Sequence, residues 1–258
     1  MSKLASQDQF IDLSDYGRPF GRYFANQLKN TRFTPIDVTL LFGTSGLIAI
    51  YCILYNHFYW AGFFIILKSI IDAADGELAR IKNTPSYTGR YLDSVFDIIL
   101  NLMLLSAICY VSATSFVFTI IAFICIQLQG TLYNYYYVIL RNKSVGGDTT
   151  SKIFEYKTPK ALPGETQKSV NILFFIYTIV YGKFDQIIHA LDPNAYKVKT
   201  FPNWFMTFVS LYGLGFQLLI MAFMLAFDWI EVIVPFFIAY SGFIFVMILI
   251  RRRYINKT

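Results

Sequence analysis

The stretch Asp72–Asp97, DAADGELARIKNTPSYTGRYLDSVFD, carries four aspartates in two closely spaced pairs. The first pair is Asp72 and Asp75, and the second pair is Asp93 and Asp97. Apolar sequence frames them, with FFIILKSII before the first pair and IILNLMLL after the second. A carboxylate next to a bilayer core is costly unless something neutralises it. Four together indicate a site for divalent cations, which prefer oxygen ligands.

Helical spacing predicts that the two pairs of aspartates face each other. Residues three or four apart lie on the same face of a helix, so each pair points in one direction. The segment 82–88 between the pairs contains Asn83 and Pro85, which predicts a tight turn and therefore two antiparallel helices. The alternative is that the aspartates cap helices or pair with buried lysines, for which Lys68 lies one turn before Asp72.

Small and basic residues accompany the aspartates. Gly76 and Gly89 remove side chains beside the expected meeting point, which leaves space for a flat ligand or another backbone. Arg80 lies at the same helix end, where its guanidinium can hold one phosphate while cations hold others. Thr34 and Thr39, at the start of the first apolar stretch, are expected near the aspartate face.

This stretch resembles the signature of the CDP-alcohol phosphatidyltransferase family, D-x2-D-G-x2-A-R-x8-G-x3-D-x3-D. Every fixed position of that signature is present: Asp72, Asp75, Gly76, Ala79, Arg80, Gly89, Asp93 and Asp97. The resemblance implies an integral membrane enzyme that is all-α and has six transmembrane helices. Such an enzyme moves a phosphoalcohol group from a CDP-linked donor to an alcohol and releases CMP.

The resemblance also implies a role for each motif residue. The four aspartates would bind two cations, Mg²⁺ or Mn²⁺, that screen the pyrophosphate of the donor. Asp97 would also act as the general base for the acceptor hydroxyl. Gly76, Ala79 and Gly89 would leave room for the cytidine and ribose, and Arg80 would bind a donor phosphate.

The substrates expected from this resemblance are CDP-diacylglycerol as the donor and an alcohol as the acceptor. One alternative keeps the chemistry but makes diacylglycerol the acceptor, as in choline- or ethanolamine-type phosphotransferases. An alternative of another class is a divalent-cation transporter, which explains intramembrane aspartates but not the glycines, the alanine and the arginine of the motif.

The acceptor site is predicted around Arg90, Asn134 and Arg141. Asn134 belongs to an unusually polar run at the end of an apolar stretch. The two arginines suit a phosphorylated acceptor, and they equally suit anionic lipid headgroups.

The composition is that of a membrane protein. Of the 258 residues, 56% are hydrophobic and 15% are charged, which is more apolar than a typical soluble domain. Several apolar stretches are long enough to span a bilayer. They are predicted at 36–55, 58–81, 89–112, 115–140, 204–227 and 229–250. Residues 1–258 are therefore predicted to form a single membrane domain, and a homodimer is left open.

The distribution of positive charge predicts the topology. The net charge is +6, from 22 Lys and Arg against 16 Asp and Glu. The connections near 54–60, 110–116 and 225–231 carry no Lys or Arg, whereas the termini, the turn near 80–90 and the region 141–203 are basic. The positive-inside rule then places both termini and the aspartates on the cytoplasmic side, in an inner membrane of bacterial or archaeal type. No nucleic-acid-binding module is visible. Membrane lipids are an expected partner.

Two regions lie outside the predicted spans. Residues 1–35 form an N-terminal segment whose stretch 10–30 predicts an amphipathic helix on the membrane surface, or else a helix packed on other protein. Its apolar stripe comprises Leu13, Tyr16, Phe20, Tyr23, Phe24 and Leu28. Residues 141–203 are predicted to be a cytoplasmic or interfacial insertion. Within it, 170–182 is only about 13 residues long, which is short for a span and favours a position in the interface.

Overall fold

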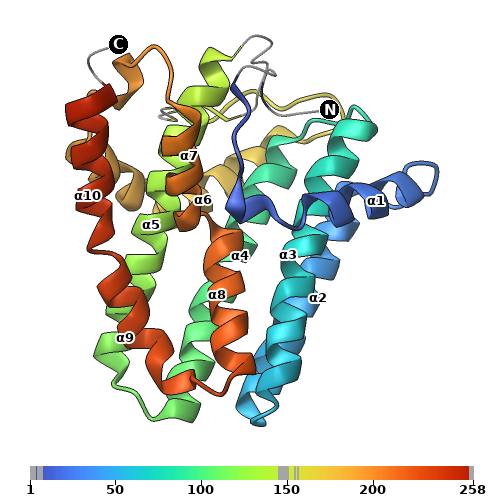
Figure 1. Ribbon diagram of the computed structural model, residues 1–258. Coiled ribbons are helices and arrows are strands. Elements are labelled where there is room, and N and C mark those ends of the chain that lie inside the picture. Colours follow the sequence, from blue (N-terminus) through green and yellow to red (C-terminus); the bar gives the residue numbers. More distant parts are fainter. Residues whose placement is uncertain (1–3, 5–7, 145–150, 154, 156, 256–258) are drawn as a thin grey trace.

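The computed structural model describes residues 4, 8–144, 151–153, 155 and 157–255, and within them it contains helices and no strand. The long helices run side by side in a bundle, while the short helix α1 (Arg18–Leu28) lies across one end (Figure 1). The turn between α3 and α4, the segment before α1 and the end of α10 lie at that same end. The three turns without Lys or Arg lie at the opposite end. The all-α prediction is confirmed for the described residues.

Four long helices follow the predicted apolar stretches closely. They are α2 (Pro35–Leu54), α3 (Phe58–Ile81), α4 (Tyr87–Ser112) and α5 (Phe116–Lys143). Thr34 caps α2 in a reciprocal capping box with Asp37, and Pro35 occupies the first helical position, where its missing N–H costs nothing. Ser86 caps α4 by accepting a hydrogen bond from the Gly89 N–H at 2.7 Å. These caps fix where α2 and α4 begin.

The predicted span at 204–227 is not one continuous helix. The chain forms α7 (Asn203–Val209), a 3₁₀ turn and α8 (Leu214–Ala226), and the two parts are bent by 52°. Gly213 adopts an extended backbone at the break, with ψ of 147°, so the helix cannot continue through it. The stretch 229–250 is likewise divided into α9 (Ile230–Tyr240) and α10 (Phe243–Ile250).

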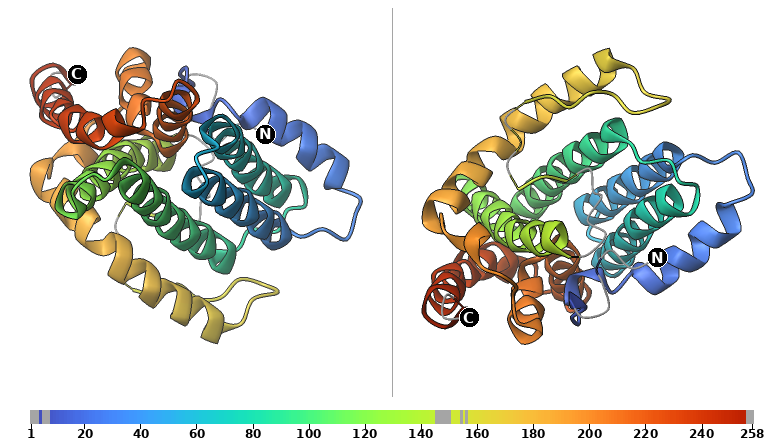
Figure 2. Two further views of the ribbon diagram at one scale, coloured as in Figure 1. Left: turned by 90° about the horizontal axis from the view of Figure 1, so that it is seen from below. Right: turned by 90° about the horizontal axis from the view of Figure 1, so that it is seen from above.

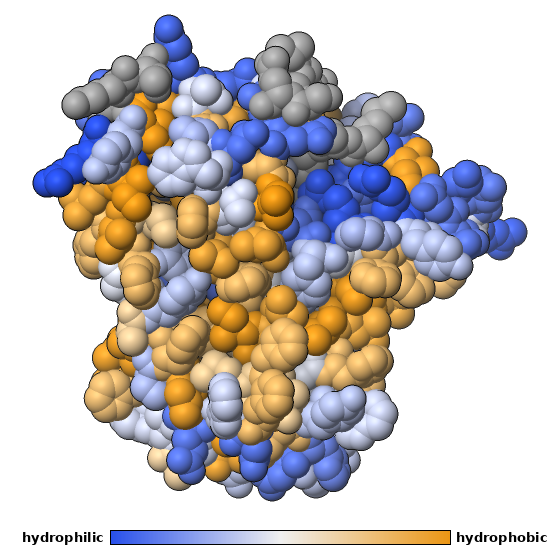
Figure 3. Space-filling view, viewed as in Figure 1, coloured by the Kyte–Doolittle hydropathy of each residue, from blue (hydrophilic) through white to orange (hydrophobic). Residues whose placement is uncertain are grey.

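The number of helices that could cross a membrane differs from the six predicted spans. Among the described residues, four helical stretches are long and apolar enough to cross a membrane, and the bent pair α7–α8 would be a fifth. They are Pro35–Leu54, Tyr87–Ser112, Phe116–Lys143 and Ile230–Ile255. Helix α3 is not among them, because its second half carries several charged side chains. On the face seen in Figure 3, apolar side chains cover the middle of the molecule and hydrophilic side chains gather at its two ends, so the fold fits a multi-pass membrane protein.

Helix α6 (Gln167–Leu191) is much longer than the predicted interfacial stretch 170–182. It crosses the outside of α4 and α5 and is seen lengthwise in the views along the bundle (Figure 2). Its inner side chains Val170 and Phe174 are buried against Tyr91 of α4, whereas Phe175 and Ile179 are exposed. The short apolar run was therefore only one part of a long helix with an exposed outer face.

The N-terminal segment is helical over a shorter range than 10–30, and it buries a different face from the predicted stripe. Gly21 and Ala25 of α1 pack on α3, where a Cβ added at Gly21 would lie 2.8 Å from the Ala74 nitrogen. The aromatic side chains Phe20 and Tyr23 point outward and are more than 60% exposed. Small residues thus allow close packing of α1 on α3, and the aromatic face remains available to lipid.

Candidate active site

Three of the predicted metal ligands meet between α3 and α4. One carboxylate oxygen from each of Asp72, Asp75 and Asp93 lies within 4.8 Å of the others, and all three residues are half-buried. The Thr39 hydroxyl on α2 donates a 2.8 Å hydrogen bond to Asp75 Oδ2. Thr39 therefore lies beside the aspartates, as predicted. Thr34 instead caps α2. The antiparallel arrangement inferred from the spacing therefore brings the acidic faces together.

The fourth aspartate, Asp97, lies outside this three-carboxylate group. It is 7% exposed, and its Oδ1 accepts a 2.6 Å hydrogen bond from the Nζ of Lys68, which is fully buried. Lys68 therefore pairs directly with Asp97, and its ammonium group also attracts the nearby Asp72 carboxylate. Lys68 lies four residues before Asp72, and Asp97 lies four residues after Asp93. The ion pair is therefore one helical turn deeper in the bundle than the three carboxylates.

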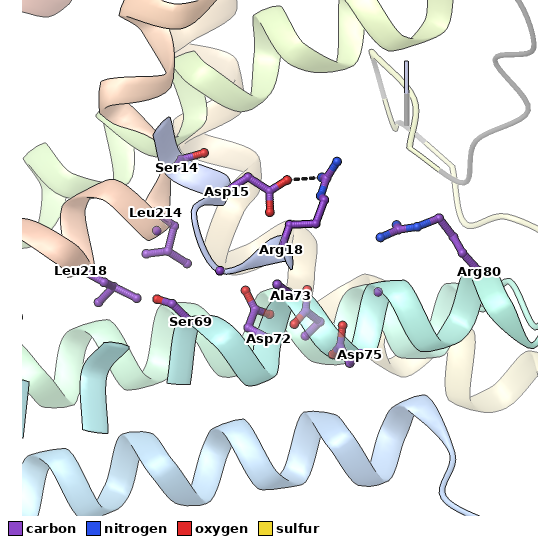
Figure 4. Close-up of a pocket in the computed structure, with 14 residues that line it drawn as sticks. Ser14, Asp15, Arg18, Ser69, Asp72, Ala73, Asp75, Arg80, Leu214 and Leu218 are labelled. Carbon is purple, nitrogen blue, oxygen red and sulfur yellow. Dashed lines mark ion pairs between the residues drawn. The ribbon is translucent and has the colours of Figure 1, made fainter. Parts of the chain in front are cut away.

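A pocket of about 190 Å³ opens over the carboxylates. The pocket is walled by α3, by the start of α8 and by the N-terminal segment that precedes α1. Figure 4 shows Asp72 and Asp75 on α3, Arg80 towards one end of the pocket, and Leu214 and Leu218 of α8 at the other end. The pocket therefore has a basic end, an acidic centre and an apolar end.

Charged side chains of the N-terminal segment cover the pocket. Arg18 forms an ion pair with Asp15 above the carboxylates (Figure 4). Burial acts to lower the pKa of the Arg18 guanidinium, but the Asp15 carboxylate and the Tyr137 and Glu77 side chains raise that pKa above its ordinary value. The guanidinium therefore stays charged beside the three carboxylates, where it can bind an anionic group.

The glycines of the motif have separate surroundings. Gly76 lines the pocket, and a Cβ added there would meet only the Arg80 guanidinium, at 3.6 Å. Gly89 is in the first turn of α4 beside its cap, where an added Cβ would lie 3.2 Å from Ser86 Oγ. Neither Gly89 nor Ala79 lines the pocket. Of the predicted donor-binding residues, the structure brings Gly76 and Arg80 to the pocket.

The predicted acceptor residues do not line this pocket. Arg90 makes a bidentate ion pair with Glu155, at 2.6 and 2.7 Å, so its charge is already neutralised. Asn134 is exposed. Arg141 is half-buried, lies within electrostatic range of Arg18 and has no acidic partner among the described residues.

Several pocket residues were not identified from the sequence. They are Ser14, Asp15, Gly17, Arg18, Ser69, Ala73, Leu214, Gly215 and Leu218. The N-terminal members and those on α8 are separated from the aspartates by long stretches of chain, and no spacing rule links them. The pair Gly213 and Gly215 was the available signal, because two glycines at a helix start allow another backbone to approach closely.

The carboxylate group fits a divalent cation. Asp93 Oδ1 is buried and has no hydrogen-bond partner among the described residues, as expected of an oxygen whose partner is a cation. Oxygen atoms alone form the donor set, and hard cations such as Mg²⁺ and Mn²⁺ prefer such a set.

The Gly215→Ala variant is expected to weaken binding of the anionic substrate. A methyl group at position 215 would overlap the Ser14 carbonyl oxygen, and the displaced segment would carry Asp15 and Arg18 out of the pocket wall. Loss of the Arg18 contact to the phosphate predicts a rise of about tenfold in the KM of the phosphate-bearing substrate.

The matched control is Gly130→Ala, where the added methyl group meets no atom closer than the Tyr212 carbonyl oxygen at 4.0 Å. The measurement compares KM for both variants with that of the wild-type protein. An unchanged KM in Gly215→Ala would show that the N-terminal segment does not shape the binding site.

Comparison with known proteins agrees with this site. The family model described as CDP-alcohol phosphatidyltransferase matches residues 33–234, which include both pairs of aspartates and α2 to α8. Neither curated proteins nor solved structures gave a match. Members of the family are transferases of phospholipid biosynthesis and use divalent metal ions. The protein is therefore a transferase that belongs to the CDP-alcohol phosphatidyltransferase family.

Proposed function

We propose that the enzyme transfers the phosphatidyl group of CDP-diacylglycerol to an alcohol and releases CMP. The observation that carries this proposal is the pocket, where three carboxylates lie between guanidinium groups and two leucines. The basic end suits the phosphates of a nucleotide, and the apolar end suits the first carbons of acyl chains. A diacylglycerol-linked donor therefore fits this pocket better than a wholly water-soluble one.

Asp72, Asp75 and Asp93 would hold the divalent cations, which we propose to be two Mg²⁺ or Mn²⁺ ions. When bound there, such cations would neutralise the diphosphate of the donor and stabilise the departing CMP. The hydrogen bond from Thr39 restricts the orientation of the Asp75 carboxylate. Arg18 and Arg80 line the pocket and would donate hydrogen bonds to the donor phosphates.

Asp97 would accept the proton of the acceptor hydroxyl. The acceptor oxygen forms a new bond to the phosphatidyl phosphorus while the bond from that phosphorus to CMP breaks, and CMP leaves with the electron pair. The ion pair with Lys68, at 2.6 Å, holds the Asp97 carboxylate in one orientation for this transfer. A general base of this type contributes about 10²–10⁴ in rate.

The acceptor would bind towards Arg141. This guanidinium has no acidic partner among the residues that the structure describes, in contrast to Arg90, and so it favours an acceptor that carries a phosphate. Diacylglycerol as the acceptor of a CDP-linked alcohol remains the alternative, and it would make no use of this arginine.

The enzyme would work as one membrane domain with its pocket on the cytoplasmic side of a bacterial- or archaeal-type inner membrane. The Lys and Arg residues at the pocket end of the bundle support this orientation. We also propose that α3 spans the bilayer as a sixth helix, because its charged residues face the pocket and protein partners. The exposed aromatic residues of α1 would rest in the lipid interface.

The test is a panel assay with the purified protein in detergent. Radiolabelled CDP-diacylglycerol and Mn²⁺ are incubated with phosphorylated alcohols, free alcohols or no acceptor, and CMP release is measured. Release that depends on a phosphorylated alcohol is the expected result. Ion flux in liposomes without CMP release under any condition would favour the transporter alternative and reject the proposal.

A further inference from the structure

Glu77 is a buried carboxylate that the aspartate motif does not account for. It occupies a variable position of the motif, is 1% exposed and does not line the pocket. Three guanidinium groups converge on its Oε1: Arg80 at 2.9 Å, and Arg18 and Arg22 at 3.7 Å each. A single buried acid thus contacts arginines of two helices, α1 and α3.

Two of these three arginines face the substrate. Arg18 and Arg80 line the pocket, whereas Arg22 is half-exposed and does not. Glu77 therefore contacts these guanidinium groups from outside the pocket, while the Arg18 and Arg80 side chains themselves line it.

We infer that Glu77 is a positioning residue that holds Arg18 and Arg80 in the geometry that binds the diphosphate of the donor. Long arginine side chains lose considerable freedom when a ligand immobilises them, and a fixed counter-ion removes that freedom before the ligand arrives. This inference rests on the proposed function, because it assigns a role in binding the CDP-linked donor.

A purely electrostatic role makes the opposite prediction. Glu77 carries a negative charge near a site for an anion, so its loss would strengthen donor binding through charge alone. A purely structural role, tethering α1 to α3, predicts lower stability without a specific change in KM. The direction of the KM change therefore separates the three roles.

The experiment measures KM for CDP-diacylglycerol, kcat and thermal unfolding in wild type, Glu77→Gln and Glu77→Asp. Glu77→Gln is expected to raise KM about tenfold with kcat within about threefold, since Arg80 loses its counter-ion and Arg18 keeps only Asp15, so both are less well ordered before binding. Glu77→Asp keeps the charge on a shorter side chain, so its KM is expected to lie between those of Glu77→Gln and wild type, a few-fold above wild type.

The matched control is Asp192→Asn. Asp192 is also a fully buried carboxylate, and it is contacted by Arg251 and Arg252 far from the pocket. Its loss is expected to lower the unfolding temperature and to leave KM unchanged.

An unchanged or lower KM in Glu77→Gln would overturn the inference, as would an equal rise in Asp192→Asn. If Glu77→Gln does not fold, Glu77→Asp decides alone: its shorter side chain should raise KM by a few-fold, and wild-type KM would refute the positioning role. Absence of CMP release by the wild-type protein would instead reject the proposed function, so the two failures are distinguishable.

Discussion

The Asp93→Asn variant is expected to release CMP at least about 10³-fold more slowly than the wild-type enzyme, because a cation site that has lost a charged ligand no longer supplies several kcal/mol of transition-state stabilisation. Asp93 is the best choice among the three carboxylates, because its buried Oδ1 has no partner among the described residues other than the ion we propose. The measurement is the initial rate of CMP release as a function of Mn²⁺ concentration.

Asp228→Asn is the matched control for this experiment. Asp228 lies in the turn at the far end of the bundle, in a left-handed conformation with φ of 59° that asparagine also tolerates. The Asp228→Asn enzyme should release CMP at the wild-type rate. An Asp93→Asn enzyme that matches the wild-type rate at every Mn²⁺ concentration would contradict a catalytic cation at this cluster.

Asp97→Asn is expected to lower turnover by about 10²-fold or more while donor binding stays within a few-fold, which is the usual scale for losing a general base. The structure adds a complication, because this change also leaves the Lys68 ammonium buried without its counter-ion. Breaking a buried pair in this way typically costs about 3–5 kcal/mol of stability. A loss of activity in the single variant alone would therefore not distinguish chemistry from folding.

The double variant Lys68→Met/Asp97→Asn separates these effects. Removing both charges of a buried pair is often neutral for stability, so the unfolding temperature should return towards that of the wild-type enzyme. Turnover should stay low, because the carboxylate is still missing. A double variant that turns over within a few-fold of wild type would show that Asp97 serves only as the structural partner of Lys68.

The sequence predicted the part of the site that local geometry determines. The spacing of Asp72, Asp75 and Asp93 specifies which helix faces they occupy, and a short turn joins the two helices, so their meeting followed from short-range rules. The extent of α3 was predicted from its apolar stretch, which is also a local property of the sequence. Asp97 shares the spacing, but Lys68 on the facing helix competes for it, and spacing alone does not decide between a cation and an ammonium partner.

The remaining parts of the site depend on contacts between distant segments. The wall formed by Ser14 and Arg18 exists because Gly213 and Gly215 let the N-terminal segment approach α8. The break at Gly213 also divides a stretch whose hydropathy is continuous, so composition predicted one span where the chain has two helices. Arg90 was predicted to be available to an acceptor, but Glu155 from a distant loop neutralises it.

The most direct test of the account is the dependence of catalysis on divalent cations. Wild-type enzyme is purified in detergent and depleted with a chelator, and CMP release from CDP-diacylglycerol is measured with the acceptor that the panel identifies. The cluster of Asp72, Asp75 and Asp93 predicts that release falls to the background rate in the chelator and returns when Mg²⁺ or Mn²⁺ is added. Release at the full rate in excess chelator would contradict the account.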